Sequence, residues 1–251
     1  MFVMLRPLCL VLMAAMCAPP AQQETDPGGR VQWPGVTVDL DRQYVDVDAM
    51  SGVRGGWLEQ VACTLGTREH ESVVYVKGLP SRIHAGLLLL GLEPGKPGRW
   101  TPRADESGML LGFDEQPPVG PRVAVNVVYR IPVRPGSSLG WFPDPVIVLE
   151  VPASVWVMDY HSGKPLPAEV GWVFGGSGMF TDYTGRERYI ADVSGSVVGI
   201  VTFGDEMLGW SRVVPDAEDI SAPEWVPNAA VMPPFGSPVI LRLRPLDPIV
   251  E

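Results

Sequence analysis

Cysteine is scarce in this sequence, which argues against a fold held together by disulfides. The chain has three cysteines among 251 residues. Two of them, Cys9 and Cys17, fall in an amino-terminal segment that we expect to be removed, so Cys63 would be the single thiol of the mature protein. No internal disulfide is then possible, and the fold must depend on a buried core.

Long apolar runs are absent after the amino-terminal segment, so we expect no transmembrane segment in the mature chain. Residues 1–21 combine Arg6, an apolar run over 8–18 and an exit rich in small residues, which is the layout of a signal peptide. The sequence therefore predicts export, to the periplasm or to the medium. Lipid anchoring at Cys17 is not expected, because Met16 stands where a lipoprotein signal has a small residue.

Basic residues are in the minority, with 19 Lys and Arg against 29 Asp and Glu and a net charge of −10 at pH 7. This balance argues against nucleic acid or an anionic lipid surface as a partner. We expect an unidentified protein or a component of the cell envelope instead, and the oligomeric state stays open. No cofactor is expected: the Gly-Gly-Ser-Gly loop at 175–178 follows a strand, but it lacks the lysine and the helix of a phosphate-binding loop.

Glycine and proline are abundant, with 28 and 27 copies dispersed between apolar runs. This distribution is typical of short strands joined by turns. We expect residues 22–34 to be a disordered lead, 35–98 an α+β region, 99–121 an irregular connection and 122–251 a β-rich region. The sequence leaves open whether the last region is a separate domain or continues the region 35–98.

The region 35–98 carries the signals that define the expected fold. Alternating apolar and polar residues over 36–48 predict two antiparallel strands, and the β-branched run 72–76 predicts another. Ser81 stands where an N-cap is wanted before a helix over 82–92. The expected fold class is therefore α+β and predominantly β: antiparallel strands with one main helix packed on a sheet, followed by an all-β, sandwich-like half.

A composite motif occupies the middle of this region. It consists of a cysteine, a glycine, a Glu-His-Glu-Ser run, a strand and a His-Ala-x-Leu-Leu helix that ends in Gly-x-x-Pro-Gly. The matching residues are Cys63, Gly66, Glu69, His70, Glu71, Ser72, His84, Ala85, Leu87, Leu88, Gly91, Pro94 and Gly95. With this motif, residues 36–98 resemble the YdjY-type domain of exported bacterial proteins. The resemblance implies export and assigns no activity. Similar sequences often carry a second cysteine near Gly52, and this chain has none there.

Four residues of the motif are candidates for chemistry: Cys63, His70, Glu71 and His84. His70 is expected to share a strand face with Ser72, and His84 to lie on the helix face toward the sheet, which would bring both imidazoles near the thiol. One interpretation is a thiolate nucleophile with a histidine base. Another is a metal site of Cys63, His70 and His84, with Glu71 as a further ligand. The alternative is a buried thiol, a hydrogen-bonded core histidine and a solvated acidic edge.

Three classes of function remain. We favour a non-catalytic exported protein that binds a partner, with strand edges of the β-rich half as the contact surface. An enzyme or metal-binding protein centred on the motif's thiol and histidines is the second class. The third is a carbohydrate-binding module that uses exposed aromatic residues. The aromatic candidates are Trp141, Phe142, Trp156 and Trp172.

Overall fold

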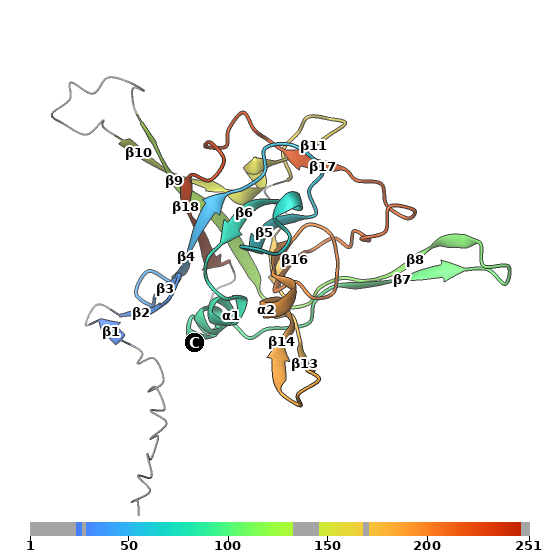
Figure 1. Cartoon of the computed structure of the whole chain (residues 1–251), viewed down its shortest axis with the longest axis horizontal. Helices are drawn as coiled ribbons and strands as arrows, with labels where there is room; N and C mark the ends of the chain where they lie inside the picture. Colours follow the sequence, from blue (N-terminus) through green and yellow to red (C-terminus); the bar gives the residue numbers. More distant parts are fainter. Residues whose placement is uncertain (1–23, 27–28, 133–145, 168–170, 247–251) are drawn as a thin grey trace, which may run out of the picture.

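The core of the molecule is a closed barrel of eight β-strands (Figure 1). The computed structural model describes residues 24–26, 29–132, 146–167 and 171–246. Around the barrel the strands follow the order β4, β18, β9, β12, β16, β15, β5 and β6, and β6 pairs with β4 to close the ring. Their bounds are Tyr44–Ser51 for β4, Gln60–Thr64 for β5, Ser72–Val76 for β6, Arg122–Pro132 for β9, Trp172–Phe174 for β12, Ser196–Gly199 for β15, Leu208–Trp210 for β16 and Pro238–Pro245 for β18.

The expected α+β class, a helix on a sheet followed by a separate sandwich-like half, is wrong. Strands from both halves of the chain belong to one ring: β5, β6 and β4 lie together, and they join the later strands where β18 pairs with β4 and where β15 pairs with β5. The junctions β5–β6 and β15–β16 are parallel. A sandwich and a barrel both require one buried face per strand. The alternation of apolar residues in the sequence therefore could not distinguish a sandwich from a barrel.

The long strands show which side of the sheet faces the core. Along β9 the residues Val123, Val125, Val127 and Tyr129 are buried, and those between them are more exposed. The same alternation occurs in β4 and β18. Burying each large apolar side chain contributes about 1.5–3 kcal/mol. The largest side chains that are fully buried include Trp156, Phe174, Ile83, Leu87, Leu208, Leu241 and Leu243.

Further strands extend the sheet beyond the ring. β1 (Glu24–Asp26), β2 (Arg30–Trp33) and β3 (Val36–Asp39) continue it from β4, and β10 (Val146–Pro152) pairs with β9. Part of the lead that we expected to be disordered is thus ordered, since residues 30–33 pair in register with β3. The expected signal peptide, with Cys9 and Cys17, lies outside the described residues.

Three two-stranded hairpins or ribbons project from the barrel or cover it. The pair β7 (Arg99–Ala104) and β8 (Leu110–Gln116) forms a long projecting hairpin (Figure 1), where we expected an irregular connection. Its strands are exposed on both faces and so have no apolar alternation to detect. The other pairs are β11 (Val157–Asp159) with β17 (Trp225–Pro227), and β13 (Met179–Thr181) with β14 (Glu187–Tyr189). Two 3₁₀ turns, η1 (Glu69–Glu71) and η2 (Ala153–Trp156), complete this part.

Two helices lie side by side next to the barrel (Figure 1): α1 (Pro80–Leu89) and α2 (Ile190–Ser194). Ser81 is not the N-cap of α1. The backbone N–H of Ser81 donates to Oδ1 of Asp192 at 2.8 Å. A carboxylate of α2 therefore accepts a hydrogen bond from one of the free N–H groups in the first turn of α1. Gly86 lets α1 approach the sheet, since a Cβ there would lie 3.1 Å from methyl groups of Val38 and Val45. Within the described ranges, neither helix is long and apolar enough to cross a membrane.

The Gly-Gly-Ser-Gly loop at 175–178 packs on the segment 94–97. Gly95 N–H donates to the Phe174 carbonyl at 3.0 Å, and Gly176 has a φ of +84°. A Cβ at Gly176 would lie 2.5 Å from Cβ of Pro94. The glycine is therefore required by a close approach of two chain segments as well as by its left-handed backbone.

Replacing Gly176 by Ala should test this close approach. Gly185, in the turn between β13 and β14, has a similar φ of +81° but no atom within 4 Å of an added Cβ. Gly185→Ala should cost about 1 kcal/mol through backbone strain alone. Gly176→Ala should cost about 2 kcal/mol more, because the added methyl meets Pro94. Urea unfolding of both variants measures the difference, and equal costs would contradict the packing argument.

Candidate functional site

Cys63 is fully buried in β5, between β15 and β6. It is a free cysteine, as expected. Burial raises the pKa of its thiol, and hydrogen bonding with Ser72 and Thr67 offsets this only in part. The group is therefore a protonated thiol at neutral pH with no access for a substrate, which does not suit a nucleophile.

His70 lies in the turn η1 and not on the strand that follows it. Its side chain is 81% exposed, and its Nε2 lies 3.4 Å from Oε2 of Glu71. The expectation that His70 shares a face with Ser72 is wrong, because the 3₁₀ turn interrupts the alternation before β6 begins.

Glu71 belongs to a charged cluster that one arginine holds together. Arg68 lies 3.9 Å from Glu71 and 3.5 Å from Asp205, and its guanidinium stacks 3.8 Å from the centre of the Phe203 ring. Burial, and secondly the neighbouring Glu71, raise the pKa of Glu59 to about 7. The cluster is thus an ion-pair network in which one carboxyl gains a proton near neutral pH.

His84 is half-buried and takes part in a short hydrogen-bond chain. Its Nδ1 lies 2.9 Å from the Tyr189 hydroxyl, which donates to the Gly176 carbonyl at 2.9 Å. Since the phenol has one hydrogen, Nδ1 of His84 must be the donor to Tyr189. Burial lowers the pKa of His84 and raises that of Tyr189, so both groups are neutral. The hydrogen-bond partner of His84 thus lies in β14, and not in the motif that contains Cys63 and His70.

The structure does not bring Cys63, His70 and His84 together. Each has its own surroundings: the inside of the sheet for the thiol, the surface for His70, and the 175–178 loop for His84. Across the described ranges, no group of three or more His, Cys, Asp or Glu side chains could hold a metal ion.

The expected aromatic platform is not formed by the two tryptophans that can be assessed. Trp156 and Trp172 are buried in the core at 0% and 3% exposure, as aromatic residues on strands commonly are. Trp141 and Phe142 lie outside the described residues. An aromatic contact that does reach the surface pairs Trp57 with Tyr160, whose ring centres are 5.0 Å apart.

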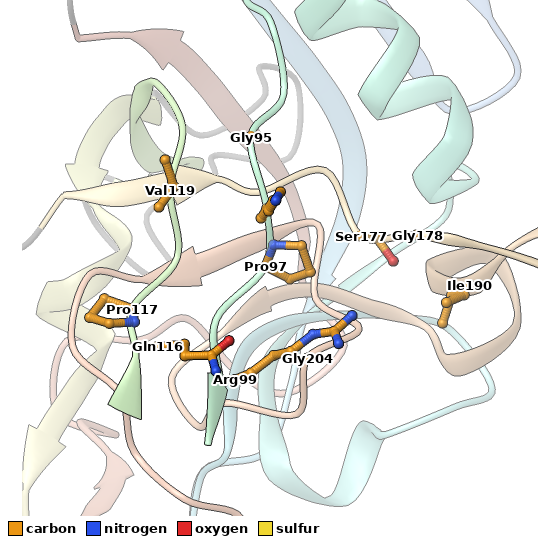
Figure 2. A pocket seen from close by; sticks show the side chains of 11 residues that line it. Gly95, Pro97, Arg99, Gln116, Pro117, Val119, Ser177, Gly178, Ile190 and Gly204 are labelled. Atoms are coloured by element: carbon orange, nitrogen blue, oxygen red, sulfur yellow. The ribbon is translucent and has the colours of Figure 1, made fainter. Parts of the chain in front are cut away.

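Three neighbouring depressions share lining residues, and together we call them the lateral groove. Its central part has a volume of about 530 Å³ and lies between segment 95–99, segment 116–119 and Ile190 (Figure 2). It shares residues Gly95, Ser177 and Gly178 with a depression of about 480 Å³ at its first end. It shares residues Arg99, Gln116 and Gly204 with a depression of about 430 Å³ at its second end.

The two ends of the lateral groove differ in character. The first end is formed by the 175–178 loop together with His84, Met179 and Tyr189. The second end is formed at the base of the β7–β8 hairpin, where Trp100 and Phe203 contribute aromatic rings. The groove thus connects the helix α1 with the projecting hairpin.

Hydrogen bonds fix the walls of the lateral groove. Lys96 and Val119 exchange backbone hydrogen bonds of 2.7 and 2.9 Å, and Arg99 stands opposite Gln116 in the register of β7 and β8. On the other wall, the Ser177 hydroxyl donates to the Asp205 carbonyl at 2.6 Å. The groove is therefore largely preformed, as ligand sites usually are.

Glu206 lies beneath the Gly204 turn of the groove. Its Oε2 accepts hydrogen bonds from the N–H groups of Gly204 at 2.8 Å and Asp205 at 3.1 Å. The residue is 1% exposed, and this burial raises its pKa to about 7. A substantial share of Glu206 is therefore protonated at neutral pH, and it acts as an anchor of the turn.

Reasoning from the sequence did not find the lateral groove. Most of its lining comes from four segments that are far apart in the chain: 94–101, 116–119, 175–178 and 202–204. The rest comes from Ser81 and His84 of α1 and from Met179, Tyr189 and Ile190. The available signal was the density of glycine and proline at 94–98 and 175–178. We interpreted both stretches as turns, and turns alone do not reveal which of them meet.

Comparison with known proteins gives no further guidance on this site, since no family model, curated protein or solved structure matches the chain. The resemblance to the YdjY-type domain stays a prediction.

The hydrogen-bond chain at His84 can be tested by a double-mutant cycle. Tyr189→Phe leaves the Gly176 carbonyl and the His84 N–H without their partner, which should cost about 1–3 kcal/mol of unfolding free energy. His84→Gln combined with Tyr189→Phe should show a coupling of about 1 kcal/mol. Tyr183→Phe, at a fully exposed tyrosine, serves as the control with no expected change. Additive losses in denaturant unfolding would show that the two side chains act separately.

The pH dependence of stability provides a test of Glu206. Because its pKa is raised in the folded protein, the folded state binds this proton more tightly than the unfolded chain does. The contribution is complete below pH 4.5, and it is lost as the pH rises toward about 7. The loss should amount to about 3 kcal/mol, since each unit of pKa shift corresponds to about 1.4 kcal/mol.

Glu206→Gln should remove this slope, and Glu106→Gln, at an exposed residue of the β7–β8 turn, should leave it in place. The measurement is the free energy of unfolding in urea at several pH values, taken as the difference between wild type and variant. A difference that does not change between pH 4.5 and 7.5 would contradict the role given to Glu206.

Proposed function

We propose that this protein is an exported, non-catalytic binding protein that holds an extended ligand in the lateral groove. The observation that carries the proposal is that three depressions adjoin one another through shared lining residues. Depressions that adjoin in this way suit a ligand that is long and narrow, such as a segment of polypeptide. Export is proposed on the layout of residues 1–21.

The chemistry of the groove supports binding over catalysis. The titratable side chains that line it are Lys96, Arg99, His84 and Tyr189. The Tyr189 hydroxyl is already engaged with the Gly176 carbonyl, and His84 with Tyr189. Among the described residues no carboxylate or thiol lines the groove. His84 lines it together with Ser81 and Ser177 but is hydrogen-bonded to Tyr189 and to neither serine, so the groove holds no complete acid–base or nucleophilic set.

The groove itself, and not the open strand edge that we favoured from the sequence, is the proposed contact surface. The edge of β10 is nevertheless a real feature: it pairs with β9 alone among the described strands, and Val146, Ile147 and Val148 are about half exposed. Such an edge can add a strand from another chain. It thus defines the competing location that an experiment has to separate from the groove.

A substitution that fills the groove tests the proposal. Val119 is 64% exposed and lines the central depression, so Val119→Trp should occupy the groove without disturbing the core. The probe is a phage-displayed library of random linear peptides, selected on the wild-type protein. Peptides from this selection should lose at least about tenfold in affinity for Val119→Trp, which corresponds to about 1.4 kcal/mol.

Val193→Trp is the matched control, since Val193 is 60% exposed and does not line the groove. It should bind the selected peptides like the wild type, by fluorescence anisotropy. Peptides that bind Val119→Trp with unchanged affinity would place the site elsewhere, such as the β10 edge, and overturn the proposal. A selection that enriches no peptide would overturn it as well.

A further inference from the structure

We infer that the lateral groove selects acidic peptide segments, and that Lys96 and Arg99 are the residues that bind their carboxylates. This inference deepens the proposed function and rests on it, because it names the chemical class of the ligand. The argument combines the position of the two cations, the absence of acid around them and the nature of the groove walls.

The two cations lie in the central part of the groove and are available to a ligand. Lys96 and Arg99 both line it and both are exposed, and the Arg99 side chain extends toward the Gly204 turn (Figure 2). Neither has a carboxylate within salt-bridge distance among the described residues. Elsewhere such partners are present: Arg242, for example, lies 2.6 Å from Asp46 and 2.9 Å from Glu150.

The surroundings of these cations contrast with the rest of the chain. The protein carries 29 acidic residues and a net charge of −10, yet no described Asp or Glu lines any of the three parts of the groove. Three carboxylates near the rim are engaged with other groups. Asp192 accepts from the Ser81 N–H, Asp205 lies beside Arg68, and Asp216 accepts from the Trp100 indole. The groove is therefore a positively charged strip on an acidic protein, and it complements an anionic ligand.

The walls strengthen the attraction of such a ligand. Pro97, Pro117, Val119 and Ile190 line the central part with apolar surface. A carboxylate that enters it loses water on those sides, and an ion pair in such surroundings is stronger than one on open surface. Arg99 adds the planar geometry that binds a carboxylate through two parallel hydrogen bonds.

Backbone groups in the groove favour a peptide over an anionic polysaccharide. Ser177 and Gly178 line the central part, and their N–H groups make no hydrogen bond to another described residue. An extended peptide offers carbonyl groups at the spacing that such donors need. Sugar rings are usually bound on aromatic faces, and no aromatic side chain lines the central part of the groove among the described residues.

The test compares labelled decapeptides by fluorescence anisotropy on the full-length mature protein. One peptide alternates glutamate with alanine, and the others replace glutamate by glutamine or by lysine. The wild type should bind the acidic peptide at least about tenfold more tightly than the glutamine peptide. In Lys96→Glu/Arg99→Glu this preference should reverse, so that the lysine peptide binds best.

The control is Lys77→Glu/Lys164→Glu, which changes the net charge by the same amount at two exposed lysines outside the groove. It should keep the preference for the acidic peptide. Thermal unfolding of both double variants establishes that they are folded. If the charge-reversal variant is unfolded, Lys96→Gln/Arg99→Gln replaces it in the test. In that variant the preference for the acidic peptide should fall below about threefold.

The outcomes separate this inference from the proposed function. Equal binding of the acidic and glutamine peptides, with both lost in Val119→Trp, would overturn the acidic preference and leave the groove as a peptide site. Loss of the preference in the Lys77→Glu/Lys164→Glu control would also overturn it, because net charge would then be the cause. An oligogalacturonate that binds the wild type where no peptide does would overturn the peptide class and indicate an anionic polysaccharide.

Discussion

Closure of the sheet between β6 and β4 is the constraint on which the rest of the structure depends. The pairing of Ala49, Met50 and Ser51 with Val76, Tyr75 and Val74 turns an open sheet into a ring. It removes the edge that β6 would otherwise present, and a closed ring has no further edge to protect. Because only three residues separate β6 from α1, closure also sets where the helix begins. The position of His84 beside the 175–178 loop follows from that start.

Two short segments with little regular structure then build the lateral groove on this frame. Segment 94–97 leaves α1 and meets both the 175–178 loop and Val119, so three parts of the chain converge at one place. The convergence is possible because Gly176 and Gly95 carry no side chain at the points of approach. The walls of the groove are therefore held by backbone contacts between these segments, and the proposed function assigns them to an extended ligand.

Local elements were predictable from the sequence, and the way they assemble was not. The run 72–76 was expected as a strand and appears as β6, because a run of β-branched and aromatic residues identifies a strand without knowledge of its neighbours. The neighbours are distant: β4 pairs with β18, nearly two hundred residues later. No local pattern contains that information, and the helix on a sheet was the simplest arrangement of the nearby elements.

The same limit explains the candidate site. Cys63, His70 and His84 lie close in sequence, and we expected them to be close in space. The turn η1 placed His70 on the surface, β5 buried Cys63, and His84 found its partner in Tyr189, more than one hundred residues away. Lys96 and Arg99 gave no signal because isolated cations in a proline- and glycine-rich stretch are typical of solvated turns.

The place of β18 has a consequence for the order in which the molecule can be assembled. This last strand lies between β4 and β9, with registered pairs to both along most of its length. The ring therefore cannot close until Pro238–Pro245 has left the ribosome, and β4 must wait for most of the chain to be synthesised. During synthesis the early strands remain without one of their final neighbours. Until β18 joins, the unfinished ring therefore presents open strand edges that could pair with other chains.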